Sequence, residues 1–228
     1  MYTIKSATSS VELRELRCIG EDSIAKMASA SCSRVFKDPL DEAKAHFQDF
    51  PWAMALFSDP TLQPFMSEAH VVKPTNTGNT FVGRTLATPD TIPAWQFFHS
   101  LPCHPEHSEG PEAPQGETLA LLKIGSGVNG HIDICHGGFV SLLLDEVTGT
   151  AADSVRPQDQ STMTAYLRVD YKKPVPTPTV VLCRAWVERT EGRKMFTVGT
   201  IEDGEGGVYA KGEALFIVIP KVTGKDKL

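Results

Sequence analysis

The chain has 228 residues, of which 41% are apolar and 22% charged, and its net charge is −6 at pH 7. This length permits one domain with a substantial core plus an extension, and the composition is that of a soluble globular protein. The negative net charge argues against a nucleic-acid binder, which needs a basic surface. No apolar run reaches the length of a membrane span, so no span is expected.

Cysteine usage and the composition of the N-terminus bear on the cellular compartment. The cysteines are five, an odd number, with no pair at the spacing of a metal site: Cys18, Cys32, Cys103, Cys135 and Cys183. Such scattered cysteines predict free thiols in a reducing compartment. The first residues mix acids and bases and lack an apolar signal core. A cytoplasmic location is therefore expected, with the mitochondrion and the peroxisome as open alternatives.

The first 60 residues have the apolar spacing of helices. Pro39 follows an aspartate and suits the first position of a helix, and Pro51 divides the same stretch in two. We therefore predict a helical N-terminal extension over residues 1–60, ahead of a single domain over residues 61–228.

The next segment combines strand candidates with a loop. Residues 81–86 and 92–98 are predicted strands, and Pro93 places the second at a strand start or a sheet edge. Residues 100–117 contain four prolines and several acids, which predicts an exposed loop with a bias toward disorder. Four residues in or beside this loop look like metal ligands: His99, Cys103, His104 and His107. The loop gives them no rigid scaffold, so no metal site is expected.

A regular pattern follows the loop. It begins with a short strand over residues 117–124, a glycine-rich turn, and an apolar helix over residues 136–153. Four strand-length segments separated by turn signals come next: residues 163–171, 180–189, 194–202 and 208–219. Their short connections imply antiparallel pairing. We predict an α+β hotdog fold, an antiparallel sheet wrapped around a long central helix.

The start of that helix carries the most chemistry in the sequence. His136-Gly137-Gly138 opens it, and backbone N–H groups at a helix start lack partners and attract negative charge. Glycine lets a substrate oxygen come close to those groups. Asp145 lies nine residues after His136 among leucines, where a charge is costly unless it has a task or a partner. An anion-binding helix start and a lone acid are parts that acyl transfer requires.

These residues resemble the hotdog-fold acyl-CoA thioesterases of the PaaI-like type, especially those with a helical N-terminal extension. The resemblance covers roughly residues 80–220. Three pieces carry it: His136-Gly137-Gly138 with Asp145, Thr164-Ala165 in the next strand, and residues 171–176 (Tyr-Lys-Lys-Pro-Val-Pro). The run Gly192-Arg193-Lys194, with Phe196, is also similar to a hairpin of the family.

The resemblance implies roles for individual residues. The family's oxyanion donor, the N–H of the middle motif residue, falls on Gly137, with Gly138 beside it as a substrate contact. The family's acid falls on Asp145, as general base or nucleophile, and an assisting hydroxyl falls on Thr164. The family takes donor and acid from different subunits, which implies a homodimer or a dimer of dimers. Since nine helical steps turn Asp145 roughly half a turn away from His136, one helix can serve two symmetry-related sites.

Some positions admit alternatives. His136 is either a general acid or, as we favour, a residue that orients the helix start and polarises the substrate carbonyl. Many family members have an asparagine six residues before this histidine, where this chain has Gly130, and Asn129 or His131 are candidate replacements in substrate binding. Glu146 is the competing acid next to Asp145.

Two further expectations concern charge near the site. Asp133 would add negative charge beside an oxyanion site unless it points to solvent. Four cations are candidates for binding the phosphates of coenzyme A: Lys172, Lys173, Arg193 and Lys194. The alternative for these four is a solvated strand end.

The sequence thus predicts an enzyme that hydrolyses acyl thioesters of coenzyme A or of an acyl carrier protein to free acid and thiol. No metal or redox cofactor is expected, and the thioester is the substrate. An acyl carrier protein is then a candidate partner. Two alternatives stay open: another hotdog reaction, such as dehydration, isomerisation or hydrolytic release of a polyketide in secondary metabolism, and a non-catalytic acyl-binding hotdog protein.

Overall fold

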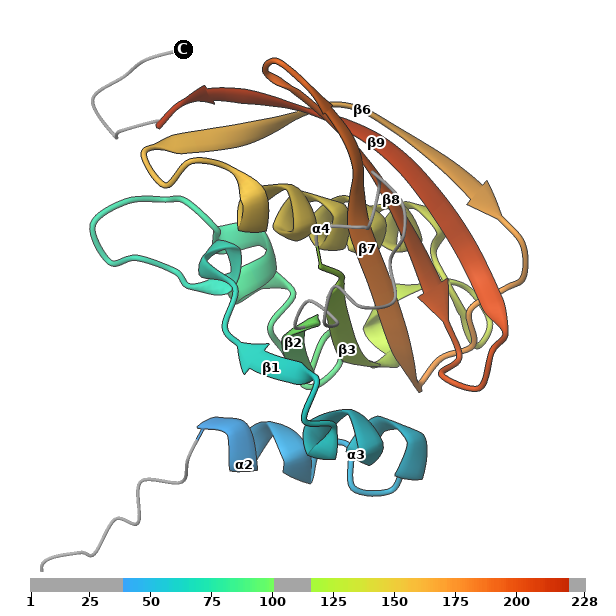
Figure 1. The fold of residues 1–228 in the computed structure, drawn as a ribbon. Helices are drawn as coiled ribbons and strands as arrows, with labels where there is room; N and C mark the ends of the chain where they lie inside the picture. Colours follow the sequence, from blue (N-terminus) through green and yellow to red (C-terminus); the bar gives the residue numbers. More distant parts are fainter. Residues whose placement is uncertain (1–38, 101–115, 222–228) are drawn as a thin grey trace, which may run out of the picture. The chain divides into compact units, whose positions relative to one another are not determined.

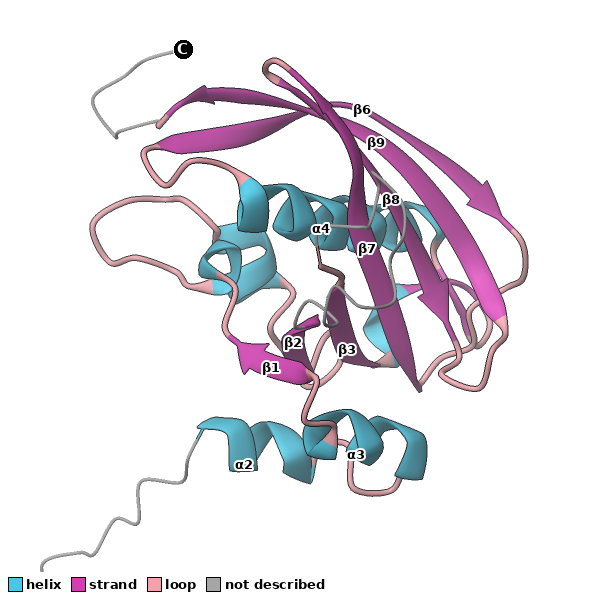
Figure 2. Ribbon diagram, viewed as in Figure 1, coloured by secondary structure: helices cyan, strands magenta, loops and turns pink. Residues whose placement is uncertain are grey.

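The computed structural model describes residues 39–100 and 116–221. Its central feature is the long helix α4 (Gly137–Val155), which lies inside the curve of a seven-stranded antiparallel sheet (Figure 1). Figure 2 separates the strands of this sheet from the helices that pack on it. The predicted hotdog arrangement of one sheet around one helix is confirmed.

The described elements have the following bounds. The sheet consists of β1 (Leu62–Phe65), β2 (Ala94–Ser100), β3 (Thr118–Ile124), β6 (Gln160–Tyr171), β7 (Thr179–Glu191), β8 (Lys194–Glu202) and β9 (Val208–Pro220). A small hairpin, β4 (Asn129–His131) and β5 (Ile134–Cys135), stands just before α4. The other helices and turns are α2 (Pro39–Ala45), α3 (Pro51–Ser58), η1 (Glu68–His70), η2 (Phe81–Thr85) and η4 (Ser126–Val128).

The order of the strands places β6 at one edge of the sheet. That order is β1-β2-β3-β7-β8-β9-β6, and every described neighbouring pair is antiparallel. The strand that directly follows α4 in the chain therefore crosses to the far edge, where its outer side has no partner strand among the described residues. The strands from β6 to β9 confirm the four predicted segments to within a few residues at each end.

Of the three apolar core clusters in the described residues, two lie on opposite faces of β2 and β3. On the inner face, Leu143 and Val147 of α4 pack with side chains such as Leu122 and Val181, all at most 1% exposed. On the other face of β2 and β3, Phe98 packs edge-on against a helix residue, Phe57, at 5.2 Å between ring centroids. Alternate residues of β3 enter the two cores, as expected for a strand covered on both faces.

A pair of glycines lets α4 lie close to the sheet. Gly199 of β8 and Gly212 of β9 are opposite each other in the ladder. A Cβ atom at Gly199 would lie 2.9 Å from Thr148 of α4, and one at Gly212 would lie 3.2 Å from Leu144. The sheet therefore has no side chain at two points of close contact with the helix.

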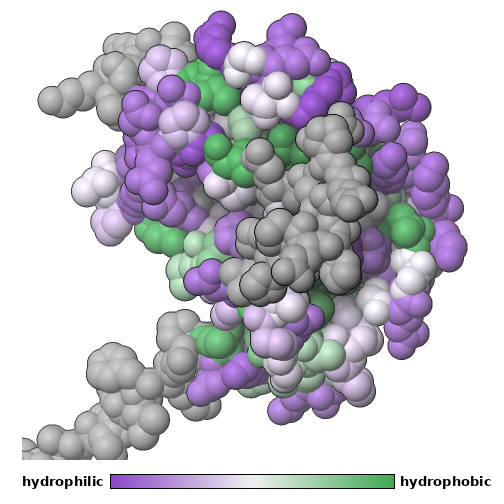
Figure 3. Space-filling model, viewed as in Figure 1, coloured by the Kyte–Doolittle hydropathy of each residue, from purple (hydrophilic) through white to green (hydrophobic). Residues whose placement is uncertain are grey.

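The N-terminal helices begin as the prolines predicted. Pro39 is the first residue of α2 and Pro51 the first residue of α3. Within the described residues, no helix has the length and the apolar character that crossing a membrane requires. Figure 3 shows hydrophilic residues around much of the face drawn, with smaller apolar groups between them.

The prediction of a strand over residues 81–86 was wrong. This segment forms the π-helical turn η2, closed by a hydrogen bond of 2.9 Å from the Leu86 N–H to the Phe81 carbonyl. A Cβ atom at Gly83 would collide with the carbonyl oxygen of His70, so the turn packs its backbone directly on η1. Over only six residues, an alternation of apolar and polar residues fits a strand, but it also fits a helical turn that buries one of its sides.

The short strand β1 was missed. It contains Pro64 and pairs with β2 at the sheet edge opposite β6, where a proline is tolerated because its outer side needs no ladder hydrogen bond. The second predicted strand, residues 92–98, is confirmed as β2, shifted by two residues.

Candidate active site

His136 caps the start of α4. Its backbone is extended (φ −63°, ψ 133°), and its ring Nδ1 accepts a hydrogen bond of 2.9 Å from the Gly138 N–H. In the neutral ring the proton then resides on Nε2. The His136 carbonyl accepts the N–H groups of Phe139 and Val140 at 2.9 and 3.1 Å. These contacts fit the favoured interpretation, in which His136 orients the helix start.

Gly137 presents the donor that oxyanion binding requires. Within the described residues, its N–H has no hydrogen-bond acceptor, whereas its carbonyl lies 3.0 Å from the Tyr171 hydroxyl and 3.2 Å from the Ser141 hydroxyl. These two hydroxyls are 2.7 Å apart and tie the first turn of α4 to the end of β6. Since the residue is exposed, a negative oxygen can reach its N–H, and the helix dipole favours that charge.

The hairpin before α4 explains why this chain has Gly130 where many of the thioesterases it resembles have an asparagine. A Cβ atom there would lie 3.0 Å from both Cα and Cδ2 of His136. An asparagine at this position would therefore displace the capping histidine. Asn129 and His131 are both exposed, but Asn129 accepts a hydrogen bond from the Thr177 hydroxyl and lines a cavity beside the helix start, whereas His131 is not among the lining residues of that cavity. Of the two candidate replacements, Asn129 is the one placed at the cavity.

Asp133 occupies the turn of this hairpin. Its backbone has a positive φ of 55°, a left-handed conformation that aspartate tolerates better than most residues. The residue is exposed, and its carbonyl accepts the Thr177 N–H at 3.0 Å. From the sequence, the charge of Asp133 was expected to affect the oxyanion site unless this residue was open to solvent. Asp133 is open to solvent.

Asp145 meets Thr164 on β6. The Thr164 hydroxyl donates a hydrogen bond of 2.9 Å to Oδ1 of Asp145. Burial raises the pKa of Asp145 above its ordinary value of 3.8, the hydrogen bond from Thr164 lowers it, and the negative charge of Glu146 raises it further. A partly buried carboxylate with a raised pKa and one hydroxyl partner has the properties of a general base.

Glu146 has a different environment. Its Oε2 lies 3.2 Å from Nε2 of His70, and both side chains are largely buried, at 20% and 15% exposure. The His70 ring in turn packs against Trp95 of β2, at 4.0 Å between centroids. The two neighbouring acids of α4 therefore face different elements, because successive helix residues point about 100° apart. Asp145 is the acid that faces the threonine of the predicted site.

The distance along α4 separates the donor from the acid. Gly137 and Asp145 are eight residues apart on one helix, which corresponds to ~12 Å along its axis. A thioester carbonyl bound at the Gly137 N–H is therefore out of reach of Asp145 in the same chain.

A cavity of about 390 Å³ lies beside the helix start. Its polar lining comes from Asn129, His136 and Gly138, and its apolar lining includes Phe81 and Leu142. Apolar walls with a few polar groups are the usual character of a small-molecule site. A second, larger cavity of about 490 Å³ lies elsewhere, beside β2.

The four predicted phosphate-binding cations separate into two pairs. Lys172 and Lys173 follow Tyr171, which pairs with Ala210 of β9, whereas Lys194 pairs with Ile217. Seven residues of an extended strand span ~23 Å, so within one chain the two pairs do not form one cluster. All four side chains are exposed, and Nζ of Lys172 lies 3.8 Å from a carboxylate oxygen of Asp170.

The structure describes only some of the residues that look like metal ligands in the sequence, and only some of the cysteines. His99 stacks on Phe65 at 3.9 Å between centroids, and burial lowers its pKa. Cys18, Cys32, Cys103, His104 and His107 lie outside the described residues. Over residues 39–100 and 116–221, no group of three or more His, Cys, Asp or Glu is arranged to hold a metal ion. Cys135 and Cys183 are free, buried thiols.

His70 is the site neighbour that the sequence did not reveal. Its partner Glu146 is 76 residues away in the chain, and no local pattern marks such a contact. Ser141 was equally unmarked, although its position four residues after Gly137 places it next to the first helical turn.

Comparison with known proteins gives matches to part of the chain. The family model described as Thioesterase superfamily matches residues 133–210. Acyl-coenzyme A thioesterase THEM4 of Mus musculus is 37% identical over 101 residues, which are 44% of this chain and 42% of that protein. The Xenopus laevis protein of the same name is 35% identical over 100 residues, or 43% of this chain and 44% of that protein. The solved BH2602 protein of Bacillus halodurans, with CoA, has a TM-score of 0.42 and 28% identity, covering 44% of this chain and 66% of that one.

The chain thus spans less than half the length of these curated relatives. The family match confirms the resemblance to thioesterases over residues 133–210, a segment that contains Gly137, Asp145 and Thr164.

Proposed function

We propose that this chain hydrolyses acyl thioesters, of coenzyme A in the first instance, to a free acid and a thiol. The observation that carries the proposal is the helix α4 itself. It combines an N–H at Gly137 without an acceptor among the described residues with a carboxylate at Asp145 that Thr164 hydrogen-bonds. The family match over residues 133–210 and the names of the relatives support this chemistry.

The proposed reaction assigns one step to each group. The thioester oxygen accepts the Gly137 N–H, which stabilises the negative charge that develops as water adds to the carbonyl carbon; one such donor contributes about 2.7–4 kcal/mol. Asp145 takes a proton from that water, and Thr164 orients the carboxylate. The carbon–sulfur bond then breaks, and the thiolate leaves and takes up the proton. His136 holds the helix start in place through its capping bond.

The proposed site forms between two copies of the chain. Strand β6 is an edge strand, and three of the large apolar side chains that are exposed in the described residues lie on it: Met163, Tyr166 and Tyr171, at 46%, 48% and 55% exposure. An unpaired edge with apolar side chains favours pairing with another strand. Antiparallel pairing of β6 with its own copy, about a two-fold axis between Leu167 and Arg168, would place Tyr171 opposite the partner's Thr164.

This arrangement accounts for two distances within one chain: the one between the Gly137 donor and Asp145, and the one between the two pairs of cations. Tyr171 contacts Gly137 and Thr164 contacts Asp145, so the axis brings the donor of one copy toward the acid of the other. The same axis brings Lys172 and Lys173 toward the partner's Arg193 and Lys194. We propose these four cations for the phosphates of coenzyme A, because clustered cations suit a polyphosphate.

A complementation experiment tests the shared site. Gly137→Pro removes the donor N–H, and Asp145→Asn removes the base. The two variants carry different tags, are co-expressed, and the mixed dimer is purified. One of its two sites then has both groups intact, so about half of the unmodified activity is expected. A mixed dimer as inactive as its parents would contradict a site shared between subunits.

Thiol release tests the reaction itself. Acyl-CoA thioesters of graded chain length and matched acyl carrier protein thioesters are incubated with the purified chain, and the free thiol is measured with a chromogenic reagent. We expect thiol release that depends on Asp145. Consumption of a β-hydroxyacyl thioester with formation of a double bond and no thiol would overturn hydrolysis, as would binding without any turnover.

A further inference from the structure

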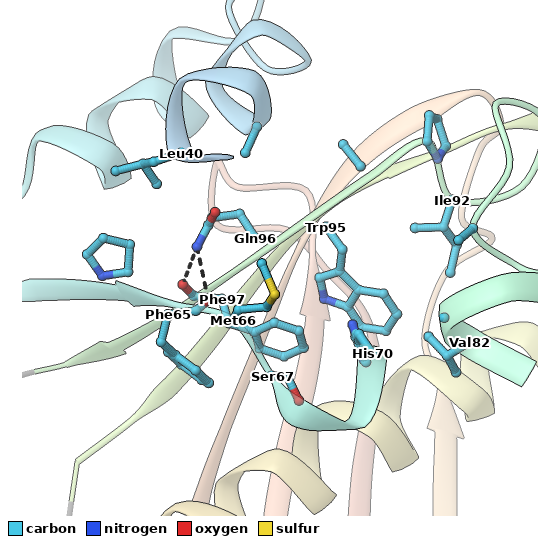
Figure 4. A pocket seen from close by; sticks show the side chains of 16 residues that line it. Leu40, Phe65, Met66, Ser67, His70, Val82, Ile92, Trp95, Gln96 and Phe97 are labelled. Atoms are coloured by element: carbon cyan, nitrogen blue, oxygen red, sulfur yellow. Dashed lines mark hydrogen bonds between the residues drawn. The ribbon is translucent and has the colours of Figure 1, made fainter. Parts of the chain in front are cut away.

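Two hydroxyl groups contact the first turn of α4 and line neither cavity. The Tyr171 and Ser141 hydroxyls lie 3.0 and 3.2 Å from the carbonyl oxygen of Gly137, and 2.7 Å separates the two hydroxyls. Neither residue is in the lining of the cavity beside β2, whose side chains Figure 4 shows, or in that of the cavity beside the helix start. Within one chain, these hydroxyls therefore act on the backbone rather than on a molecule held in either cavity.

The two hydroxyls can replace each other as donors. Each has one proton and can also accept a hydrogen bond. While one hydroxyl donates to the Gly137 carbonyl, the other can donate to the first, and the two can exchange these roles. The carbonyl therefore has a hydroxyl donor in either arrangement, in addition to the backbone N–H that a helix supplies four residues later.

The peptide group that joins Gly137 to Gly138 is held at both ends. Its carbonyl accepts a hydroxyl, and its N–H donates to Nδ1 of His136 at 2.9 Å. Glycine has more backbone freedom than any other residue, so two glycines in succession leave this peptide group free to rotate unless something holds it. The hydroxyls and the histidine therefore fix a rotation that the glycines themselves leave open.

The proposed oxyanion donor belongs to the peptide group just before. The Gly137 N–H shares that group with the His136 carbonyl, which accepts the N–H groups of Phe139 and Val140. Both peptide groups are planar and meet at the Cα atom of Gly137, so the backbone turns there only about the two bonds of that atom. The direction of the donor N–H therefore depends on the bonds that hold both groups.

Tyr171 reaches the helix start from a fixed place on the sheet. It ends β6, and the N–H groups of Lys172 and Lys173 after it both donate to the Tyr209 carbonyl of β9, at 2.8 and 3.0 Å. Its ring lies beside Gly137, at 3.6 Å from the place that a Cβ atom would occupy. The tyrosine thus links the start of α4 to the backbone of the sheet.

We propose that Tyr171 and Ser141 are positioning residues for the oxyanion donor: they hold the Gly137–Gly138 peptide group and so keep the Gly137 N–H in the direction that meets the thioester oxygen. This inference rests on the proposed hydrolysis. Tyr171 is 55% exposed in the single chain, so water competes for its hydrogen bond. Since β6 is the strand proposed to pair with a second copy, pairing would shield this bond from water and strengthen it.

Steady-state kinetics of the full chain test the role in the reaction. Tyr171→Phe and Ser141→Ala each leave one hydroxyl for the carbonyl, so each should lower kcat only slightly, whereas the double variant should lose roughly threefold to tenfold. KM should change little, because a misdirected donor mainly loses the charge that develops in the transition state. In a Gly137→Pro background, which has no donor N–H, the double change should lower kcat no further.

Matched controls separate this role from general damage. Tyr209→Phe removes a hydroxyl from the neighbouring strand β9, and Ser154→Ala removes one that donates to the Ala151 carbonyl, at 2.7 Å, near the other end of α4. Both should keep kcat. Circular dichroism and size-exclusion chromatography verify the folding and the oligomeric state of each variant. The proposal is overturned if the controls lose as much as the double variant, or if the loss persists in full in the Gly137→Pro background.

Hydrogen exchange gives a readout that needs no turnover. Glycine pairs occur in the sequence only at Gly137-Gly138 and Gly206-Gly207. Cell-free synthesis with glycine labelled at the carbonyl carbon and the nitrogen therefore gives two carbonyl–amide correlations, of which Gly137→Ala removes one and so identifies it. The Gly138 N–H should exchange roughly threefold to tenfold faster in the double variant. The Gly207 N–H, which donates to Asp203 at 2.8 Å, should exchange at an unchanged rate.

The exchange rates and the kinetics can each overturn the proposal. An unchanged exchange rate of the Gly138 N–H in the double variant would do so whatever the activity. Faster exchange with an unchanged kcat would do so as well, because the donor would then not depend on this peptide group. Absence of thiol release from the unmodified chain would instead refute the proposed hydrolysis, and the exchange rates would still decide whether the two hydroxyls hold the peptide group.

Discussion

The hydroxyl of Thr164 and the carboxylate of Asp145 are joined by a hydrogen bond of 2.9 Å. This bond connects the edge strand β6 with the central helix α4, and it leaves the second carboxylate oxygen of Asp145 without a hydrogen bond among the described residues. An oxygen of this kind can accept a proton from water, so the pair has the geometry of an oriented base. The neighbouring acid, Glu146, is paired with His70 and has no comparable position.

Asp145→Asn is expected to lower kcat/KM by a factor of about 10²–10⁴, the usual contribution of a general base. The amide keeps the size of the side chain and can still accept the Thr164 hydrogen bond, so the fold should survive, as circular dichroism can verify. Glu146→Gln is the matched control and should retain activity within a few-fold. Asp145 is not the base if, in steady-state assays, Glu146→Gln lowers kcat/KM by this factor and Asp145→Asn does not.

The Thr164 hydroxyl is expected to set the pH below which activity declines. Its hydrogen bond lowers the pKa of Asp145, which burial otherwise raises. Thr164→Val removes that bond, so the pKa should rise and the acid limb of the pH profile of kcat/KM should move to higher pH. Thr164→Ser keeps the hydroxyl and should leave the limb in place. An unmoved limb in the valine variant would show that Asp145 does not control it.

Gly137→Pro deletes the proposed oxyanion donor with little disturbance. Gly137 is the first residue of α4, where proline is favoured, and His136 already has the extended backbone that a residue before proline adopts. We expect kcat to fall by about 10²–10³. Gly137→Ala keeps the N–H, and its Cβ would lie at an ordinary 3.6 Å from the Tyr171 ring. Equal activity of the two variants would exclude this N–H as the donor.

The raised pKa of Asp145 also has a consequence for stability. The folded chain binds this proton more tightly than the unfolded chain, so stability falls as pH rises from the unfolded pKa through the raised folded pKa. Above that window the charged, partly buried Asp145 carries a constant cost, which Asp145→Asn removes. The variant should therefore melt at a higher temperature than the unmodified chain at pH 7, and this advantage should vanish below about pH 3.5. Calorimetry across pH can measure both.

Gly130→Ala is expected to destabilise the chain by about 1–3 kcal/mol, the usual effect of overpacking. The added Cβ would lie 3.0 Å from the His136 backbone, which cannot move without loosening the start of α4. Denaturant unfolding measures the loss, with Gly137→Ala as the comparison that adds a methyl group where there is room. A Gly130→Ala variant as stable as the unmodified chain would refute the steric account of this glycine.

Local patterns predicted much of the fold because they reflect local physics. Alternating apolar residues and turn signals marked strands β6 to β9, and Pro39 and Pro51 marked two helix starts, since each depends on neighbours in the chain. Residues 81–86 were misassigned because the turn η2 is shaped by its contact with His70, which is distant enough in sequence to leave no local signal.

The sequence by itself predicted the candidate chemistry of the helix start: which residue offers an N–H at the first helical position, which acid lies on the same helix, and which threonine lies on the following strand. Only the tertiary structure gave the two adjacent acids different partners, because it placed Thr164 against Asp145 and His70 against Glu146. It alone also formed the cavity beside β2. The reason is physical: a residue's type and its helical or strand spacing are local properties, whereas burial and partners depend on which distant segments pack together.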